Sequence, residues 1–124
     1  MSTQTASASS NFNATPSISG DEAILTLTGT GDMAAVAPLQ HCLTEMHELV
    51  LTRCLGAARI DISALYLLNS SCIKTLIGFL HANMASKRRY PVRFVVDERL
   101  AWQARTLAVL GRMAPGLVSV GATQ

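Results

Sequence analysis

Two adjacent hydroxyl groups, those of Ser70 and Ser71, lie where the sequence predicts the start of a helix. Asn69 immediately precedes them and is a favoured N-cap residue. Apolar residues then recur at helical spacing: Ile73, Leu76, Ile77, Leu80 and Met84. The first turn of a helix carries backbone N–H groups without intrahelical partners, so a phosphoryl group there would meet a favourable field and add up to about two negative charges at pH 7. The serine pair is therefore a candidate switch site.

The elements that hold these serines follow an alternating pattern. Strands are expected at residues 12–18, 23–28, 58–62, 92–96 and 117–120. Helices are expected after a cap at Asp32 and over residues 70–86 and 99–112. Pro16 confines the first strand to a sheet edge, and Ser19-Gly20-Asp21 supplies the turn of a hairpin with the second strand. The alternation predicts an α/β domain with parallel strand pairs and crossover helices.

Several segments together resemble a known family. Asp61-Ile62-Ser63, a short apolar loop, and Asn69-Ser70-Ser71 at a helix start resemble the phosphorylation loop of STAS domains, the family of anti-sigma factor antagonists. Upstream, residues 25–29 and 32–39 are similar to the family's second strand and first helix. The resemblance covers residues 12–121 and implies a single STAS-like domain, with a mixed four- to five-stranded sheet and crossover helices packed mainly on one face. Residues 1–11 have too little apolar surface to fold and are expected to form a disordered tail.

The resemblance assigns roles to residues around the serines. It implies that Ser70 is the phosphoacceptor, with Ser71 as second choice, and that Asp61 and Ser63 support the loop. The family loop commonly reads Asp-Ser-Ser-Gly or Asp-Ser-Thr-Gly, whereas this chain reads Asn-Ser-Ser-Cys at residues 69–72. A branch of the family that regulates diguanylate cyclases, with Asn-Thr-Ser-Ser-Ile-Lys, is locally more similar. The target implied is a sigma-factor regulator or a diguanylate cyclase.

The helix after the serines has a second face of mostly short side chains. That face comprises Ser71, Lys74, Thr75, Gly78, Ala82 and Ala85. A glycine inside a helix costs about 1 kcal/mol relative to alanine, so its presence at position 78 favours a steric requirement over a neutral solvent face. The predicted partner-binding residues are Asn69, Ser71, Lys74, Thr75, Gly78 and Ala82.

Charge is divided unevenly along the chain. Residues 1–73 hold two basic and six acidic side chains, and residues 74–124 hold eight and two, for a net charge of +2. The densest cluster, Lys87-Arg88-Arg89, follows a predicted helix end, where cations are favourable. Docking of an acidic partner is an alternative for this cluster. One short cluster with a small net charge is a poor footprint for nucleic acid.

Catalytic and metal-binding patterns are weak. Neither serine has the flanking glycines of a Gly-x-Ser-x-Gly nucleophile turn, and the spacing of His41, His47 and His81 does not suit a metal site. Cys72 at a helix start would have a lowered thiol pKa if it were a redox sensor, or would be buried as a small hydrophobe. The three cysteines lack Cys-x-x-Cys spacing, which favours reduced thiols in the cytoplasm. Neither a targeting segment nor an apolar run of roughly 20 residues is present, so membrane insertion is not expected.

Three functions from different classes follow. The first is a phosphorylation-controlled protein-binding module of the anti-sigma factor antagonist type in a bacterial partner-switching circuit. Its implied partners are a GHKL-type serine protein kinase that acts as anti-sigma factor and a PP2C-type phosphatase, with no cofactor. The second is a constitutive STAS subunit of a larger complex, such as a lipid-transport ATPase. The third is a small enzyme that uses Ser71 or Cys72.

Overall fold

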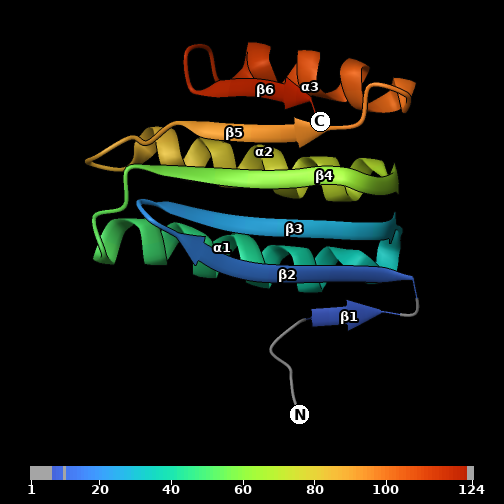
Figure 1. Cartoon of the computed structure of the whole chain (residues 1–124), viewed down its shortest axis with the longest axis horizontal. Coiled ribbons are helices and arrows are strands. Elements are labelled where there is room, and N and C mark those ends of the chain that lie inside the picture. Colours follow the sequence, from blue (N-terminus) through green and yellow to red (C-terminus); the bar gives the residue numbers. More distant parts are fainter. Residues whose placement is uncertain (1–6, 10, 123–124) are drawn as a thin grey trace.

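Strands with alternating apolar and polar residues build one mixed sheet in this computed structural model, which describes residues 7–9 and 11–122. In chain order the elements are β1 (Ser7–Ser9), β2 (Phe12–Ser19), β3 (Glu22–Gly31), the 3-10 helix η1 (Met33–Ala35), α1 (Val36–Thr52), β4 (Ala57–Leu68), α2 (Ser70–Ala85), β5 (Val92–Val96), α3 (Ala101–Met113) and β6 (Val118–Ala122). The strands lie in the order β1-β2-β3-β4-β5-β6 (Figure 1). The first two pairs are antiparallel and the other three are parallel.

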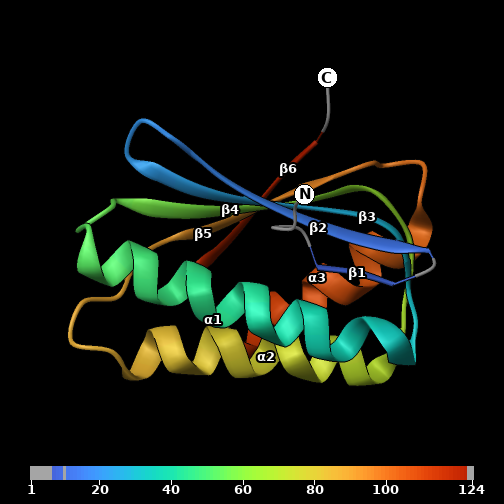
Figure 2. The same ribbon diagram turned by 90° about the horizontal axis from the view of Figure 1, so that it is seen from below.

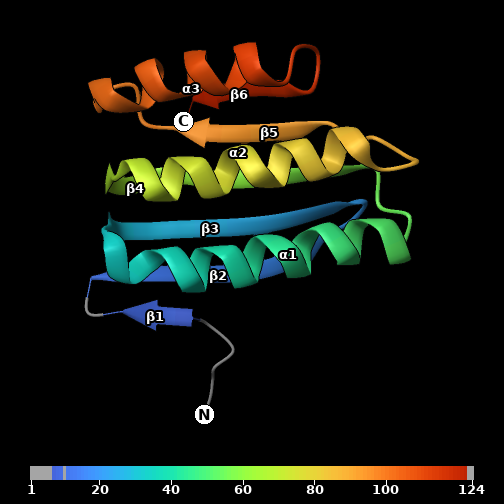
Figure 3. The ribbon, with the colours of Figure 1, turned by 180° about the vertical axis from the view of Figure 1, so that it is seen from behind.

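The helices cover one face of the sheet, as expected. α1 and α2 lie side by side on this face, and α3 lies beside β6 on the same face (Figures 2 and 3). Within the described residues no helix covers the opposite face. Side chains on that open face are mainly polar and include Thr15, Thr26, Thr28, Arg59, Asp61 and Arg93. Their polarity allows this face of the sheet to remain in contact with water.

The core lies between the sheet and the helices. Alternate residues of the two central strands point toward the helices and are at most 1% exposed: Leu25, Leu27, Ile60 and Ile62. The apolar stripe predicted for α2 packs onto them, with Leu76 and Leu80 buried and Ile73, Ile77 and Met84 partly buried. The apolar faces of the strands and of α2 are thus buried against each other in one layer, and this packing holds α2 against the sheet.

The number of strands exceeds the expectation of four to five. The five predicted strands are present as β2 to β6, and β1 adds a sixth strand within the described ranges. Residues 7–9 therefore lie in the sheet, paired with Phe12–Ala14, and not in the predicted disordered tail. Of the rest of that predicted tail, residues 1–6 and 10 lie outside the described residues, and Asn11 is a turn residue before β2. Three backbone pairings with β2 were not foreseeable from a segment with so little apolar character.

β4 is much longer than the strand predicted at residues 58–62. The short apolar loop expected before Asn69 is wrong, because the strand continues to Leu68. Its pairing with β3 shifts register twice, between Thr26 and Thr28 and between Gly29 and Thr30. At each shift β4 contains one extra residue, which is the definition of a β-bulge. Bulges re-aim side chains, and these two lie directly before the serine pair.

Candidate functional site

The serine pair begins α2 at the carboxyl end of β4. The side-chain oxygen of Asn69 accepts a hydrogen bond from the Cys72 backbone N–H at 2.9 Å, and the Ile73 N–H donates to the Asn69 carbonyl at 3.0 Å. Asn69 has extended backbone angles, so the predicted N-cap is confirmed. Ser70 is exposed and Ser71 is half-buried. The more accessible hydroxyl is therefore that of Ser70, the first choice of phosphoacceptor.

The start of α2 is anchored to the end of β3. The Asn69 backbone N–H donates to the Gly31 carbonyl at 2.8 Å. The buried Cys72 thiol lies 3.7 Å from the Gly31 carbonyl oxygen and 3.5 Å from that of Asp32. A Cβ atom at Gly31 would lie 2.7 Å from Leu68 Cδ1 and 3.1 Å from the Leu67 carbonyl oxygen, so a larger residue there would have to displace the Leu68 side chain. The backbone beneath Ser70 is therefore held on two sides.

Burial sets the chemistry of the Cys72 thiol. Its desolvation raises the thiol pKa, and the negative charge of Asp32 raises it further, while a backbone hydrogen bond at Asn69 has the opposite effect. The prediction that Cys72 has the lowered thiol pKa of a redox sensor is therefore wrong. Cys72 is fully buried, which confirms its alternative interpretation as a small hydrophobe.

The two predicted support residues bind each other at the first bulge of β4. One carboxylate oxygen of Asp61 accepts from the Ser63 backbone N–H at 3.0 Å and from the Ser63 hydroxyl at 2.6 Å. Both residues lie within β4, the element that precedes the serines, and their hydrogen bonds hold the backbone of the strand at the bulge. Whether this geometry supports a phosphorylated loop stays a prediction.

A buried glutamine fixes the same bulge from the other side. The Gln103 amide of α3 donates to the Ile62 carbonyl at 2.7 Å and to the Leu65 carbonyl at 3.1 Å, and its oxygen accepts from the Asp97 N–H at 2.8 Å. Gln103 is 1% exposed. The sequence did not reveal this role, because glutamine usually lies at the surface. Its place in the predicted helix, four residues before the apolar Leu107, was the available signal.

Three large apolar side chains are exposed at this end of the sheet. Met33 of η1 is 67% exposed, and Tyr66 and Leu67 at the end of β4 are 66% and 51% exposed. The pairing of Thr30 with Leu67 and of Gly31 with Leu68 brings the η1 junction next to the end of β4. We call Met33, Tyr66 and Leu67 the apolar patch. The sequence analysis placed Tyr66 and Leu67 in a short apolar loop and Met33 in the segment similar to the family's first helix, and it gave none of the three a role in binding.

The predicted partner-binding face on α2 is only partly a free surface. Lys74, Gly78 and Ala82 are exposed, whereas the half-buried Thr75 hydroxyl donates to the Ser71 carbonyl at 3.0 Å. Gly78 and Ala82 line a hollow of about 150 Å³ between α2 and α1. A Cβ atom at Gly78 would meet nothing within 4 Å, so no contact inside the described chain requires glycine there. The structure brings Asn69, Ser70, Ser71 and Lys74 together at the start of α2 and leaves Gly78 and Ala82 two to three turns away.

The two arginines of the basic cluster bind helix ends. Arg88 donates to the Val50 carbonyl near the end of α1 at 3.0 Å, and Arg89 donates to the Met84 carbonyl near the end of α2 at 2.9 Å. These contacts confirm the interpretation of the cluster as cations at helix C-termini.

Two of the histidines have partners in the helix layer. His47 contacts the Tyr90 hydroxyl at 2.7 Å, and His41 lies 3.3 Å from Glu45 within α1. Among the described residues, no group of three or more histidine, cysteine, aspartate or glutamate side chains is arranged to hold a metal ion.

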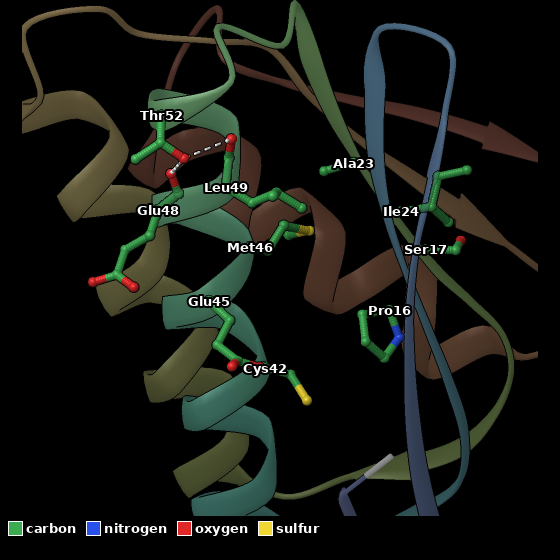
Figure 4. A pocket seen from close by; sticks show the side chains of 10 residues that line it. All are labelled: Pro16, Ser17, Ala23, Ile24, Cys42, Glu45, Met46, Glu48, Leu49 and Thr52. Carbon is green, nitrogen blue, oxygen red and sulfur yellow. Dashed lines mark hydrogen bonds between the residues drawn. The ribbon is translucent and has the colours of Figure 1, made fainter. Parts of the chain in front are cut away.

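A larger hollow lies far from the serines. It has a volume of about 460 Å³ between α1 and the hairpin of β2 and β3, and Cys42, Met46 and Leu49 point from α1 toward the strands (Figure 4). Ile24 near the start of β3 and Thr52 at the end of α1 place this hollow at the opposite end of the sheet from Ser70. It therefore belongs to a different part of the molecule from the serine pair.

Comparison with solved structures identifies the fold. No protein-family model matches this sequence, and no curated protein matches it. A crystal structure of an anti-sigma factor antagonist from Mycobacterium paratuberculosis superposes with a TM-score of 0.64, over 88% of this chain and 87% of that chain, at 19% sequence identity. This chain therefore has the fold of an anti-sigma factor antagonist, which confirms the STAS-like α/β fold that the resemblance implied. Separately, no helix among the described residues is both long and apolar enough to cross a membrane.

Proposed function

We propose that this protein is a phosphorylation-controlled protein-binding module of the anti-sigma factor antagonist type, acting in a cytoplasmic partner-switching circuit in bacteria. The observation that carries the proposal is an exposed hydroxyl, that of Ser70, in the first turn of a firmly anchored helix at the end of the sheet that exposes the apolar patch. The likeness to an anti-sigma factor antagonist at the level of the fold supports the same class.

The apolar patch supports binding of a protein. Tyr66 and Met33 each leave about two thirds of their surface in water, at 66% and 67% exposure. Large exposed apolar side chains near polar ones are typical of protein interfaces, and aromatic residues and methionine are enriched there. Arg99, 89% exposed at its side chain, and Lys74 supply polar groups at the same end of the sheet. Because the Arg99 guanidinium is already paired with Asp97, the resulting surface suits a partner with an apolar centre and polar groups of mixed charge around it.

Phosphorylation of Ser70 would act on this surface through charge. A partner that covers the patch would also desolvate part of the phosphate, and removing one uncompensated charge from water costs several kcal/mol. Every 1.4 kcal/mol is about tenfold in affinity. Lys74 follows Ser70 by one helical turn and would neutralise only part of a dianion. The unphosphorylated form is therefore the binding form in this proposal.

The partners in the proposal follow from the resemblance. A GHKL-type serine kinase that is also the anti-sigma factor would modify Ser70, and a PP2C-type phosphatase would restore it. The Asn-Ser-Ser sequence keeps a diguanylate cyclase as the other target, because it is similar to the branch with that role. No residue in the proposal acts as a catalyst.

A constitutive STAS subunit is the second candidate function. The apolar patch favours it independently, because hydrophobic binding to a transport ATPase or another large complex needs no phosphate. In that case Ser70 would serve only as a first-turn residue of α2.

The test begins with the intact mass of the protein from its own cells, followed by peptide mapping across residues 67–74. We expect a phosphoryl group on Ser70, absent after Ser70→Ala and retained after Ser71→Ala. Capture of partners with the unmodified chain, Ser70→Ala and Ser70→Asp then reads the binding state, with Ser17→Asp at the opposite end of the sheet as control. Loss of a partner with Ser70→Asp alone supports the switch. An unmodified mass during growth and starvation, with equal capture by all variants, would support the constitutive subunit.

A further inference from the structure

The two edges of the sheet are protected differently. At one edge, β1 pairs with Phe12–Ala14 of β2, and Pro16 follows in the same strand. At the other edge, β6 pairs with β5 alone, and no strand of the described residues lies on its outer side (Figure 1). Proteins usually protect an edge with proline, charge or a covering segment, because its free N–H and C=O groups attract another strand. β6 reads Val-Ser-Val-Gly-Ala and has neither proline nor charge.

The side chains of β6 leave an apolar surface beside this free edge. Val120 is 53% exposed, although its neighbour on β5, Phe94, is fully buried. A hollow of about 360 Å³ lies next to Val120, with Val96, Leu100 and Leu107 among its walls. An apolar side chain brought alongside Val120 by an added strand would lose contact with water and gain contact with this hollow.

We propose that β6 is a self-association edge, where a second copy of this chain adds its own β6 in antiparallel orientation about a twofold axis. A twofold contact uses the same surface on both copies, so the edge must be complementary to itself. An antiparallel pair centred on Ser119 places Val118 of each copy opposite Val120 of the other, on the helix side of the joined sheet. Cross-strand pairs of β-branched residues stabilise such a ladder.

Charges at the two ends of β6 favour a second copy over a foreign strand. Ala122 pairs with Val96, so Glu98 lies on the loop that follows β5, at the carboxyl end of the edge and next to the ion pair of Asp97 with Arg99. Arg112 is exposed in the last turn of α3, just before the amino end of β6. Antiparallel pairing brings Glu98 of one copy toward Arg112 of the second copy, and the reverse. Neither side chain has an ion-pair partner among the described residues of its own chain.

Sedimentation velocity of the full chain over a range of concentrations tests this proposal. We expect a concentration-dependent monomer–dimer equilibrium that is at least tenfold weaker in Val120→Lys and unchanged in Ser17→Lys at the opposite edge. Circular dichroism and thermal unfolding establish that both variants fold. Hydrogen exchange on the unaltered chain supplies a second readout, in which amides of residues 118–122 become protected as concentration rises.

Charge exchange tests the orientation of the two strands. Glu98→Arg and Arg112→Glu should each weaken self-association several-fold, and the double variant should restore it. A monomer at every concentration would overturn the proposal. A dimer that is indifferent to Val120→Lys and shows no added protection in β6 would overturn it equally. Association that survives Val120→Lys but fails after Ser17→Lys would assign the contact to the other edge.

Discussion

Two strand-to-helix junctions lie at the same end of the sheet and differ in what they expose. Where β3 enters η1, the Asp32 carboxylate accepts from the Ala34 N–H at 3.1 Å and caps a 3-10 helix of three residues. Where β4 enters α2, the neutral amide of Asn69 accepts from the Cys72 N–H at 2.9 Å and caps a helix of 16 residues. The first junction already carries a negative charge. The second has a neutral cap and an exposed hydroxyl, so its helix field is available to an added phosphate.

The second junction also depends on more of the chain. Asn69 and Cys72 contact the carbonyls at the end of β3, and Gln103 of α3 holds the bulged end of β4. The β3 junction thus acts as a support for the β4 junction. A site placed on such a multiply held backbone is preorganised, which is what a kinase or a partner surface requires.

The largest expected effect comes from removing the glutamine that holds β4. Gln103→Leu leaves the Ile62 and Leu65 carbonyls and the Asp97 N–H without their partner. Each buried unpaired group costs about 1–3 kcal/mol, so the free energy of unfolding should fall by about 3 kcal/mol in urea titrations. Gln40→Leu removes only an exposed contact with Thr44 and should stay within about 0.5 kcal/mol. Equal small losses in both variants would show that Gln103 does not set the difference between the junctions.

The two caps should contribute unequally. Asn69→Ala is expected to lower the free energy of unfolding by about 1 kcal/mol, the usual cost of losing an N-cap. Asp32→Ala should cost less, because η1 is a single short turn. Asn69→Asp keeps the acceptor oxygen and serves as the matched control with near-parental stability. Chemical denaturation measures all three, and a larger loss for Asp32→Ala would reverse the ranking of the junctions.

The start of α2 was predictable because its signals are local. Asn69 is a strong N-cap residue, and the stripe from Ile73 to Met84 has a clear helical period, so neither requires knowledge of distant segments. The hairpin of β2 and β3 followed from turn chemistry, the parallel strand pairs from the alternation of elements, and the one-sided helix layer from the resemblance to STAS domains. The same local logic explained Arg88 and Arg89, whose positions after a helix end indicated their contacts.

The details around the site depend on tertiary contacts and were missed. The bulges that extend β4 to Leu68 arise from its register with β3, which one strand's sequence does not encode. Gln103 is buried only because β4 presents free carbonyls at its bulge. Tyr66 and Leu67 are adjacent, so a regular strand would expose at most one of them on the open face. The second bulge, next to Tyr66, removes that restriction and leaves both in water.

The far ends of α1 and α2 provide a third region for comparison, through His47. Burial lowers the pKa of His47, and the charge of Glu48 opposes this shift. At His47, the unfolded chain therefore binds a proton more readily than the folded chain does. The contribution of neutral His47 to the free energy of unfolding is complete above about pH 6.5 and is lost as the pH falls toward the lowered pKa. The urea concentration at the unfolding midpoint should decrease as the pH is lowered from about 7.5 to about 5.5. His47→Gln should reduce this dependence of the midpoint on pH. His81→Gln, at an exposed position, should leave this dependence unchanged, and the opposite ranking would contradict the assignment.

The smallest expected effect on stability, and the sharpest on reactivity, concerns the thiol shared by the two junctions. Cys72 is buried with a raised pKa, whereas Cys54 is exposed after α1. Thiolate formation and access both control alkylation, so iodoacetamide should modify Cys54 at least tenfold faster than Cys72 in the native protein. Both should react readily in concentrated urea, which makes the unfolded chain its own control, and peptide mass spectrometry reads each site. Fast alkylation of Cys72 in the native protein would mean that the start of α2 opens in solution. It would also make a function based on a reactive Cys72 thiol an alternative to phosphorylation of Ser70.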